Sequence, residues 1–194
     1  MIHLPRRSAL MNCPVCKPSP TLEPAPLEEG KLTARRCPSC NGHFIKSADY
    51  WRWRAIAGDN LPALPATLDT RPTTEAGGLR LCPDCGHVMG RYKVGHGIGF
   101  TVDRCRNCEG AWLDGGEWEA LRMRNLHDDL PRIFDDEWQR AVKREVQEQA
   151  TEESFRRRLG DEDYAKVQAM RAWLDPHPKR SELFAYLQLR NRRE

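Results

Sequence analysis

The chemistry of this 194-residue chain is concentrated in eight cysteines. They form four Cys-x-x-Cys pairs: Cys13 and Cys16, Cys37 and Cys40, Cys82 and Cys85, and Cys105 and Cys108. Twenty residues separate the first two pairs and 19 separate the last two. Two pairs at such a distance can place four thiolates around one ion at about 2.3 Å. The spacing predicts two structural Zn²⁺ sites, each closed by four cysteines and lacking the open position that a hydrolytic water needs.

Three other uses of cysteine compete with zinc. Structural disulfides need an oxidising compartment, and nothing in the sequence points to one. A thioredoxin-like redox pair needs a βαβ context, and four copies of the pair argue against it. An iron–sulfur cluster also takes four cysteines, usually at other spacings. Proline at the second position of three pairs favours the tight turn of a zinc knuckle, and these are Pro14, Pro38 and Pro83.

The charge balance argues against a general affinity for nucleic acid. The formal charge of +3 treats the cysteines as neutral. Eight thiolates and two Zn²⁺ ions would bring the zinc-loaded chain to about −1, without the basic excess that nucleic-acid binding usually shows.

No stretch approaches a membrane span, and Arg6 and Arg7 are not followed by the apolar run of a secretory signal. We therefore expect a cytoplasmic protein that does not bind membranes.

An internal repeat of about 68 residues extends beyond the cysteines. The matched positions are Gly42 and Gly110, Phe44 and Trp112, Ile45 and Leu113, Asp49 and Glu117, and Tyr50 and Trp118. We expect Phe44 and Trp112 to pack over the zinc knuckles, because small ribbons have little other core. A helix should follow each ribbon, over 47–57 and over about 115–125, with Asp114 as N-cap of the second.

The remaining elements follow from periodicity and turn residues. Strands are expected over 88–92 and 100–104, whereas several prolines shorten the first strand of the first ribbon. The predicted fold is a small zinc-stabilised α+β fold with two tandem four-cysteine zinc ribbons, each followed by a short helix, and a C-terminal helical segment. The predicted segments are a first ribbon and helix (1–58), a linker (59–80), a second ribbon and helix (81–127) and a helical tail (128–194).

The tail is predicted to form three helices. They begin near Asp135, at Asp161 and at Ser181, and a Pro-His-Pro sequence separates the last two. About 65 residues in this form should need the ribbons or a second copy of the chain to bury their apolar faces.

The second ribbon resembles the transcription factor IIB-type zinc fingers, a family of small, mostly prokaryotic zinc ribbons. The resemblance rests on the two cysteine knuckles followed by Gly110-Ala-Trp-Leu-Asp-Gly-Gly-Glu117. The first ribbon is a weaker match, with Phe44, Lys46 and Asp49 in place of the Trp, Asp and Glu. The resemblance implies zinc ligation by all eight cysteines and suggests transcription only through likeness of fold.

Arginines and tryptophans near the ribbons are the candidate contact residues. They are Arg35, Arg36, Arg104 and Arg106 beside the knuckles, and Trp51, Arg52, Trp53 and Arg54 on the first helix. Trp51 and Trp53 lie about 200° apart on a helix, so one of them should be exposed or covered by the tail. The simpler interpretation is that the arginines lie on a solvated strand face and that both tryptophans pack between domains.

Three functions remain open. The first is a non-catalytic interaction module that binds a protein partner or self-associates. The second is a transcription-associated nucleic-acid-binding protein that uses the candidate contact residues. The third is an enzyme or redox switch based on a labile zinc–thiolate site. The sequence shows no nucleophile–base constellation, so we predict neither an enzyme nor a small-molecule substrate.

Overall fold

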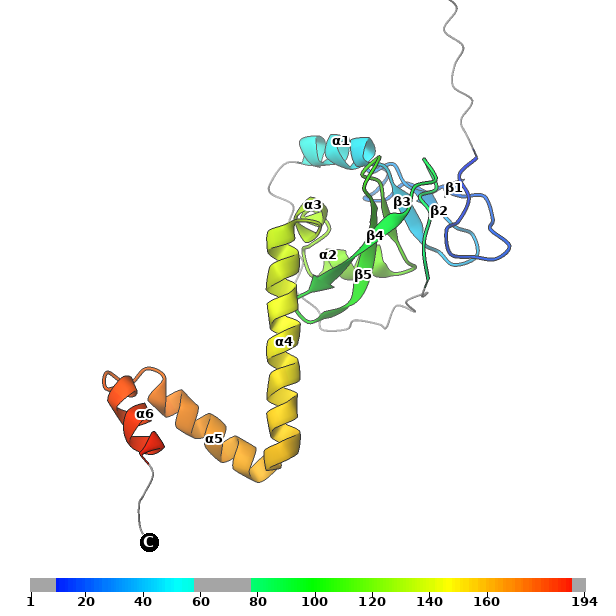
Figure 1. Cartoon of the computed structure of the whole chain (residues 1–194). Helices are drawn as coiled ribbons and strands as arrows, with labels where there is room; N and C mark the ends of the chain where they lie inside the picture. Colours follow the sequence, from blue (N-terminus) through cyan, green and yellow to red (C-terminus); the bar gives the residue numbers. More distant parts are fainter. Residues whose placement is uncertain (1–9, 58–77, 190–194) are drawn as a thin grey trace, which may run out of the picture. The chain divides into compact units, whose positions relative to one another are not determined.

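A computed structural model describes residues 10–57 and 78–189. Its strands are β1 (Glu23–Pro24), β2 (Arg35–Arg36), β3 (His43–Ile45), β4 (Met89–Gly95), β5 (Ile98–Cys105) and β6 (Ala111–Leu113). Its helices are α1 (Ser47–Ala57), α2 (Glu117–Met123), α3 (Leu130–Ile133), α4 (Asp136–Leu159), α5 (Asp161–Leu174) and α6 (Arg180–Gln188) (Figure 1). Residues up to Lys143 form one compact unit and residues from Arg144 form a second. Most of the predicted linker, 59–77, lies outside the described residues.

The first unit is built on one antiparallel sheet that contains both ribbons. Its strand order is β1-β2-β3-β6-β5-β4. The ribbons meet where β3 pairs with β6, and Phe44 lies opposite Trp112. These two residues occupy the same place in the sequence repeat, so an approximate twofold axis relates the repeats at this pair. The relative orientation of the ribbons, which the sequence left open, is thus set by strand pairing.

The β4–β5 hairpin is longer than the sequence predicted. The ladder extends to the pair Gly95 and Ile98, leaving only His96 and Gly97 in the turn. Both turn residues have positive φ, 52° and 77°, which suits a two-residue hairpin connection that follows the twist of the strands. Residues 93–95 and 98–99, which lie between the two predicted strands, are therefore also strand. In the first ribbon, β1 has only two residues, in line with the prolines around it.

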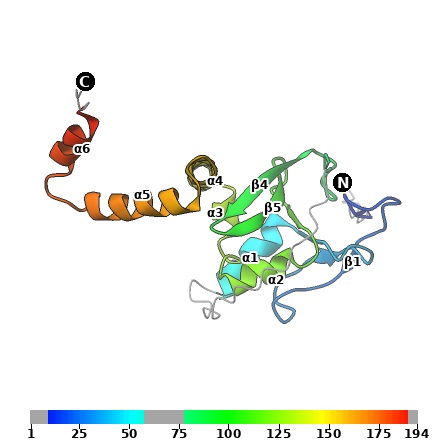
Figure 2. The ribbon, with the colours of Figure 1, turned by 90° about the horizontal axis from the view of Figure 1, so that it is seen from below.

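The core of the first unit is larger than expected for two small ribbons. Seventeen buried residues from both ribbons, α1, α2 and the α3 region form one cluster. Trp53 of α1 packs edge-on against Trp118 of α2, with ring centroids 6.0 Å apart, and the two helices overlap in the view of Figure 2. The Tyr50 hydroxyl donates to the His127 carbonyl at 3.1 Å and accepts from the Leu130 amide at 3.2 Å. These contacts fix α1 against the segment that follows α2.

The helix after the second ribbon corrects one prediction. α1 has the predicted bounds, but α2 begins at Glu117 instead of Gly115 and ends at Met123. Its N-cap is Gly116, with φ 86° and no side-chain cap, so Asp114 is not the N-cap. The backbone between β6 and α2 turns through the left-handed region, which moves the helix start past Asp114.

The second unit contains residues 144–159 of α4, about four turns, followed by α5 and α6. α4 runs without a break through Thr151, α5 begins at the predicted Asp161, and α6 begins one residue before the predicted start. Leu174 is the one large apolar side chain that is buried among residues 144–189. None of the helices described in either unit combines the length and apolar character required for a membrane span.

Candidate metal centre

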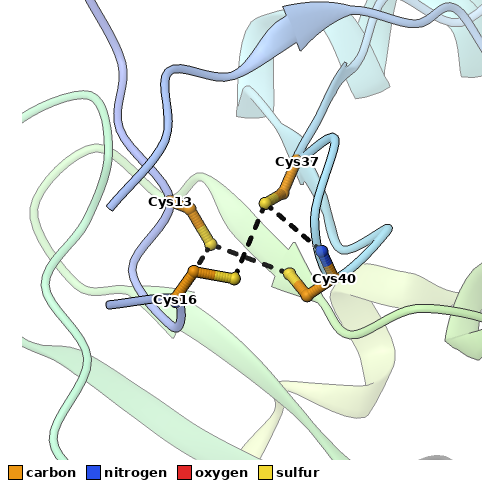
Figure 3. A group of neighbouring side chains, drawn as sticks. All are labelled: Cys13, Cys16, Cys37 and Cys40. Atoms are coloured by element: carbon orange, nitrogen blue, oxygen red, sulfur yellow. Dashed lines mark hydrogen bonds between the residues drawn. The ribbon is translucent and has the colours of Figure 1, made fainter. Parts of the chain in front are cut away.

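The first four-cysteine group joins the two knuckles of the first ribbon (Figure 3). The Sγ atoms of Cys13 and Cys40 are 3.7 Å apart, and those of Cys16 and Cys37 are 3.8 Å apart. Cys13 and Cys37 are buried, whereas Cys16 and Cys40 are partly exposed. Each knuckle therefore contributes one buried and one partly exposed sulfur.

The second group repeats this arrangement in the second ribbon. Cys82 pairs with Cys108, and Cys85 with Cys105, with Sγ atoms 3.4 Å apart in both cases. The burial pattern along the four cysteines is the same as in the first group. The two repeats thus build the same kind of centre.

The geometry of both groups fits one Zn²⁺ ion each. Within each group the four sulfurs lie within 4.8 Å of one another. A regular tetrahedron with Zn–S bonds of about 2.3 Å has sulfurs about 3.8 Å apart, close to the observed separations. The same separations are far longer than the S–S bond of about 2.05 Å in a disulfide, and all eight cysteines are free. The residues fit two structural Zn²⁺ ions with no ligand position left open.

Backbone turns explain how each knuckle aims its sulfurs. In the first knuckle, the amides of Val15 and Cys16 both donate to the Cys13 sulfur at 3.4 Å. In the second, the Cys40 amide donates to the Cys37 sulfur at 3.5 Å. Such donors stabilise negative charge on the sulfur and hold it toward the ion.

Burial and hydrogen-bond donors together determine the pKa of each cysteine thiol. Burial raises the pKa of Cys13 and of Cys108 to about 11 each. Burial acts in the same sense on Cys85, but hydrogen bonds from His87, Asn107 and Cys105 outweigh it and lower its pKa to about 6. A bound Zn²⁺ must therefore displace protons from the buried thiols, and the sites should bind zinc more weakly in acid.

The aromatic residues of the repeat pack across the ribbons. A Cβ on Gly42 would collide with the Trp112 indole, and one on Gly110 would lie 2.5 Å from the Phe44 ring. Each glycine follows a zinc-binding cysteine of one ribbon by two residues, and each ring belongs to the other ribbon. Phe44, Trp112 and cysteines of both centres share one buried cluster. The aromatic side chains thus pack near the knuckles as expected, but each ring lies beside the knuckle of the other ribbon.

A buried charge network anchors the end of the second ribbon at strand β6, and no pattern in the sequence predicted it. Arg80 pairs with Asp103 and, at 2.7 Å, with Asp114. The Trp112 indole N–H donates to Asp114 at 2.8 Å, so this carboxylate holds the strand β6 instead of capping α2. Arg80 and Asp103 each precede a cysteine ligand by two residues, but this spacing does not reveal that they pair.

Glu117 belongs to the same region and is fully buried. Its Oε2 accepts the Asp114 amide at 2.7 Å, while its Oε1 has no partner among the described residues. Burial raises the pKa of Glu117 to about 8, and the nearby Asp114 carboxylate adds to the effect. Glu117 therefore bonds back to the Asp114 amide as in a capping box, but the Asp114 side chain does not cap the helix.

The structure separates the two candidate tryptophans as helix geometry requires. Trp53 is 2% exposed in the core, whereas Trp51 is 54% exposed. Among the candidate arginines, Arg52 pairs with Asp49, and Arg54 lies 3.8 Å from Asp128. Only some of the candidate contact residues on α1 are therefore accessible to a partner.

The arginines beside the knuckles lie in different settings. Arg104 pairs with Glu109 at 2.7 Å and lies 5.2 Å from the centre of the Phe134 ring. Arg35 is half-buried on β2, while Arg36 and Arg106 are exposed. The basic residues near the zinc centres are thus partly neutralised by neighbouring carboxylates.

A pocket of about 260 Å³ lies beside Trp51 and within the first unit. Buried Ile45, Tyr50 and Leu130 are among its apolar lining residues, and Trp51 forms part of its wall. Charged side chains at its lining are Arg104, Glu109 and Asp135. The sequence did not reveal this pocket, because its lining comes from β3, α1, the second ribbon and the α3 region.

Comparison with known proteins agrees with this geometry. The family model described as "Transcription factor zinc-finger", the transcription factor IIB zinc ribbon, matches residues 12–55 and 81–123. The two matched segments contain all eight cysteine ligands. No curated protein and no solved structure matched the chain in the corresponding searches. Residues 12–55 and 81–123 therefore each match the zinc ribbon of the transcription factor zinc-finger family, in tandem and each around one four-cysteine group.

Proposed function

We propose that the protein is a non-catalytic interaction module of a reducing compartment such as the cytoplasm, and that its zinc ribbons bind a segment of a protein partner. The observation that carries this proposal is the exposed Trp51 at the wall of a pocket with a mixed apolar and charged lining. Large aromatic side chains next to apolar pockets are frequent anchors of protein interfaces. The two Zn²⁺ ions hold the elements that form the pocket and take no part in chemistry.

The size of the pocket favours a side chain over a small-molecule substrate. Its volume of about 260 Å³ is below the range of roughly 300–1,000 Å³ that is typical of ligand pockets. One aliphatic or aromatic side chain of a partner peptide is a suitable occupant. Arg104 and Glu109 at the lining pair with each other, so Asp135 is the lining carboxylate that would favour a basic residue beside that anchor.

The neutralised arginines make nucleic acid the weaker alternative. Arg52, Arg54 and Arg104 each lie near a carboxylate of the same unit. Trp53 is buried and cannot stack on a base. A nucleic-acid surface would have to rely mainly on two exposed arginines, Arg36 and Arg106, together with the exposed Trp51.

Panning of a displayed random-peptide library on the zinc-loaded protein tests this proposal. We expect selected peptides to share an apolar anchor with a neighbouring basic residue, and to lose at least tenfold in affinity on Trp51→Ala. Trp173→Ala, an exposed tryptophan of the second unit, is the matched control and should bind normally. Fluorescence anisotropy with labelled single- and double-stranded DNA and RNA gives the opposing outcome. Binding that weakens steeply with salt and is lost on Arg36→Ala and Arg106→Ala would overturn the proposal in favour of nucleic acid.

A further inference from the structure

The chain that leads into the second zinc centre forms an outer edge of the sheet. The Met89 amide, at the start of β4, donates to the Arg80 carbonyl at 2.9 Å, and the Cys82 amide donates to the His87 carbonyl at 2.8 Å. β4 is the last strand in the order of the sheet, so the chain before the zinc centre runs antiparallel along its outer side. We call residues 79–82 the ribbon edge.

The outer side of the ribbon edge carries unpaired backbone groups. Arg80 and Cys82 direct their bonded groups toward the chain of β4. Because successive residues of an extended strand direct these groups to opposite sides, the N–H and C=O groups of Leu79 and Leu81 point away from the sheet. Within residues 10–57 and 78–189, none of these four groups makes a hydrogen bond. Two donors and two acceptors are therefore available to another strand.

Three aliphatic side chains share one face of the ribbon edge. Leu81 lies directly opposite Val88 in an antiparallel bridge, and Leu79 lies on the same face because it precedes Leu81 by two residues. Leu79, Leu81 and Val88 are 75%, 51% and 52% exposed, whereas Arg80 and Cys82 on the opposite face are buried. Strand register thus places three exposed aliphatic side chains on one surface.

The first ribbon shows that the fold does not require the aliphatic pair. Its equivalent bridge, in the same place relative to the first knuckle, joins Asn12 and Thr21. Both residues are exposed, and the Thr21 hydroxyl donates to Oδ1 of Asn12 at 3.3 Å. The same backbone ladder is therefore built with a polar pair in one ribbon and with Leu81 and Val88 in the other. A role in binding explains the exposed aliphatic pair, because a role in folding does not.

The ribbon edge also lacks the usual protection of an edge strand. Edge strands are commonly protected from pairing with other chains by exposed charges or by proline. Residues 79–82 contain no proline, and their one charged side chain, Arg80, is buried on the other face. An open edge with aliphatic side chains is the type of surface to which an extended peptide adds as a further strand.

A cation lies at the end of the edge where the chain enters it. The Arg91 guanidinium donates to the Gly78 carbonyl at 3.2 Å, and the Arg91 side chain is 34% exposed. Arg91 shares the Asp103 carboxylate with Arg80, so one carboxylate faces two guanidinium groups. An added strand with an acidic residue beside Arg91 would therefore be favoured.

We propose that the ribbon edge accepts a β-strand from a protein partner, and that this strand is an extended segment with alternating aliphatic side chains and an acidic residue at one end. Its backbone would pair with Leu79 and Leu81, and its aliphatic side chains would pack on these two leucines and Val88. None of these residues lines the Trp51 pocket, and the proposal does not rest on the function assigned to that pocket.

Fluorescence anisotropy with the labelled peptide Asp-Val-Thr-Val-Thr-Val-Asp tests the proposal on the full-length zinc-loaded protein. We expect saturable binding. Two N-methylated forms of the peptide, one methylated on its valine amides and one on its threonine amides, are the matched controls. These two sets of amides lie on opposite sides of an extended strand, and only one side faces the ribbon edge. One methylated form should therefore bind at least tenfold more weakly than the other.

A double variant tests the site on the protein. Leu81→Asn combined with Val88→Thr gives the second ribbon the polar pair of the first and should bind the unmethylated peptide at least tenfold more weakly. Leu79 stays in place, because Leu10 is exposed at the equivalent position of the first ribbon. Native mass spectrometry should show two Zn²⁺ ions in the variant, as in the wild type. Trp51→Ala should bind the peptide normally, so loss of the pocket and loss of the edge can be told apart.

Three results would overturn the proposal. Equal affinity of the two methylated peptides would show that no backbone pairing occurs. Unchanged binding by the zinc-loaded double variant would place the peptide elsewhere on the protein. Absence of binding to the wild type up to about 1 mM peptide would show that the edge does not accept such a strand. A wild-type dimer that the double variant dissociates would then assign the edge to a second copy of the chain.

Discussion

The indole of Trp112, in the second ribbon, lies against the α-carbon of Gly42, in the first. The equivalent ring of the first ribbon, Phe44, lies in the same way against Gly110 of the second. Because each glycine lies two residues after a cysteine knuckle, each zinc centre is bordered by an aromatic side chain from the other repeat. The two ribbons therefore share one core, and neither buries its own aromatic residue alone.

Gly42→Ala should destabilise the first unit. The added methyl group would overlap the Trp112 ring, and overpacking of this kind typically costs about 1–3 kcal/mol. Gly99→Ala is the matched control, because its Cβ would meet no atom within 4 Å. Chemical unfolding followed by tryptophan fluorescence measures both. Equal stability of the two variants would show that the Trp112 ring moves away at little cost.

Cys105→Ser should weaken the zinc site of the first ribbon as well as its own. Loss of one ligand would loosen β6, and β6 is paired with β3 beside the first centre. We expect a chelator to remove the remaining zinc at a concentration at least tenfold lower than in the wild type, while α5 and α6 keep their helical signal. Wild-type chelator resistance of the first site would mean that the ribbons fold independently.

Glu117→Gln should flatten the dependence of stability on pH. The folded-state pKa of Glu117, about 8, lies above its ordinary value of 4.5, because the carboxyl is buried. Its contribution is therefore fully favourable below about pH 4.5 and is lost as pH rises toward 8. The loss is on the order of a few kcal/mol. The Gln side chain can still accept the Asp114 amide but cannot ionise.

The difference in unfolding free energy between Glu117→Gln and the wild type should thus grow from pH 5 to pH 8.5 in favour of the variant. The comparison is made with both proteins zinc-saturated, so that the pH dependence of zinc binding affects them alike. A constant difference across this range would show that Glu117 ionises freely in the folded protein.

Arg80→Met should be among the most damaging substitutions outside the cysteines. It would leave Asp103 and Asp114 buried without their shared cation, and breaking a buried pair in this way costs about 3–5 kcal/mol. Arg52→Met removes an exposed i,i+3 pair with Asp49 and should cost less than about 1 kcal/mol. Thermal unfolding distinguishes the two variants. Similar melting temperatures would refute a structural role for the network.

Local patterns in the sequence predicted much of the fold. The cysteine spacing predicted both centres, and helix periodicity with the Pro-His-Pro stop predicted α1, α5 and α6 closely. The 200° separation of Trp51 and Trp53 correctly required one of them to be out of the core. These features depend on residues near one another in the chain.

The features that the sequence missed depend on contacts between distant segments. The β3–β6 pairing joins residues about 68 positions apart, and no local signal encodes its register. Asp114 pairs with Arg80 and does not cap α2, although its position in the sequence predicted an N-cap. The Trp51 pocket likewise exists only because four separate segments converge.

Native mass spectrometry during a chelator titration tests most directly whether the two zinc ribbons form one cooperative unit. The untreated protein should carry two Zn²⁺ ions. Because the centres share one sheet and one aromatic core, the two-zinc form should give way to the zinc-free form with little of the one-zinc form at any chelator concentration. A one-zinc form that dominates over a broad range, and that keeps a compact charge-state distribution, would contradict the account.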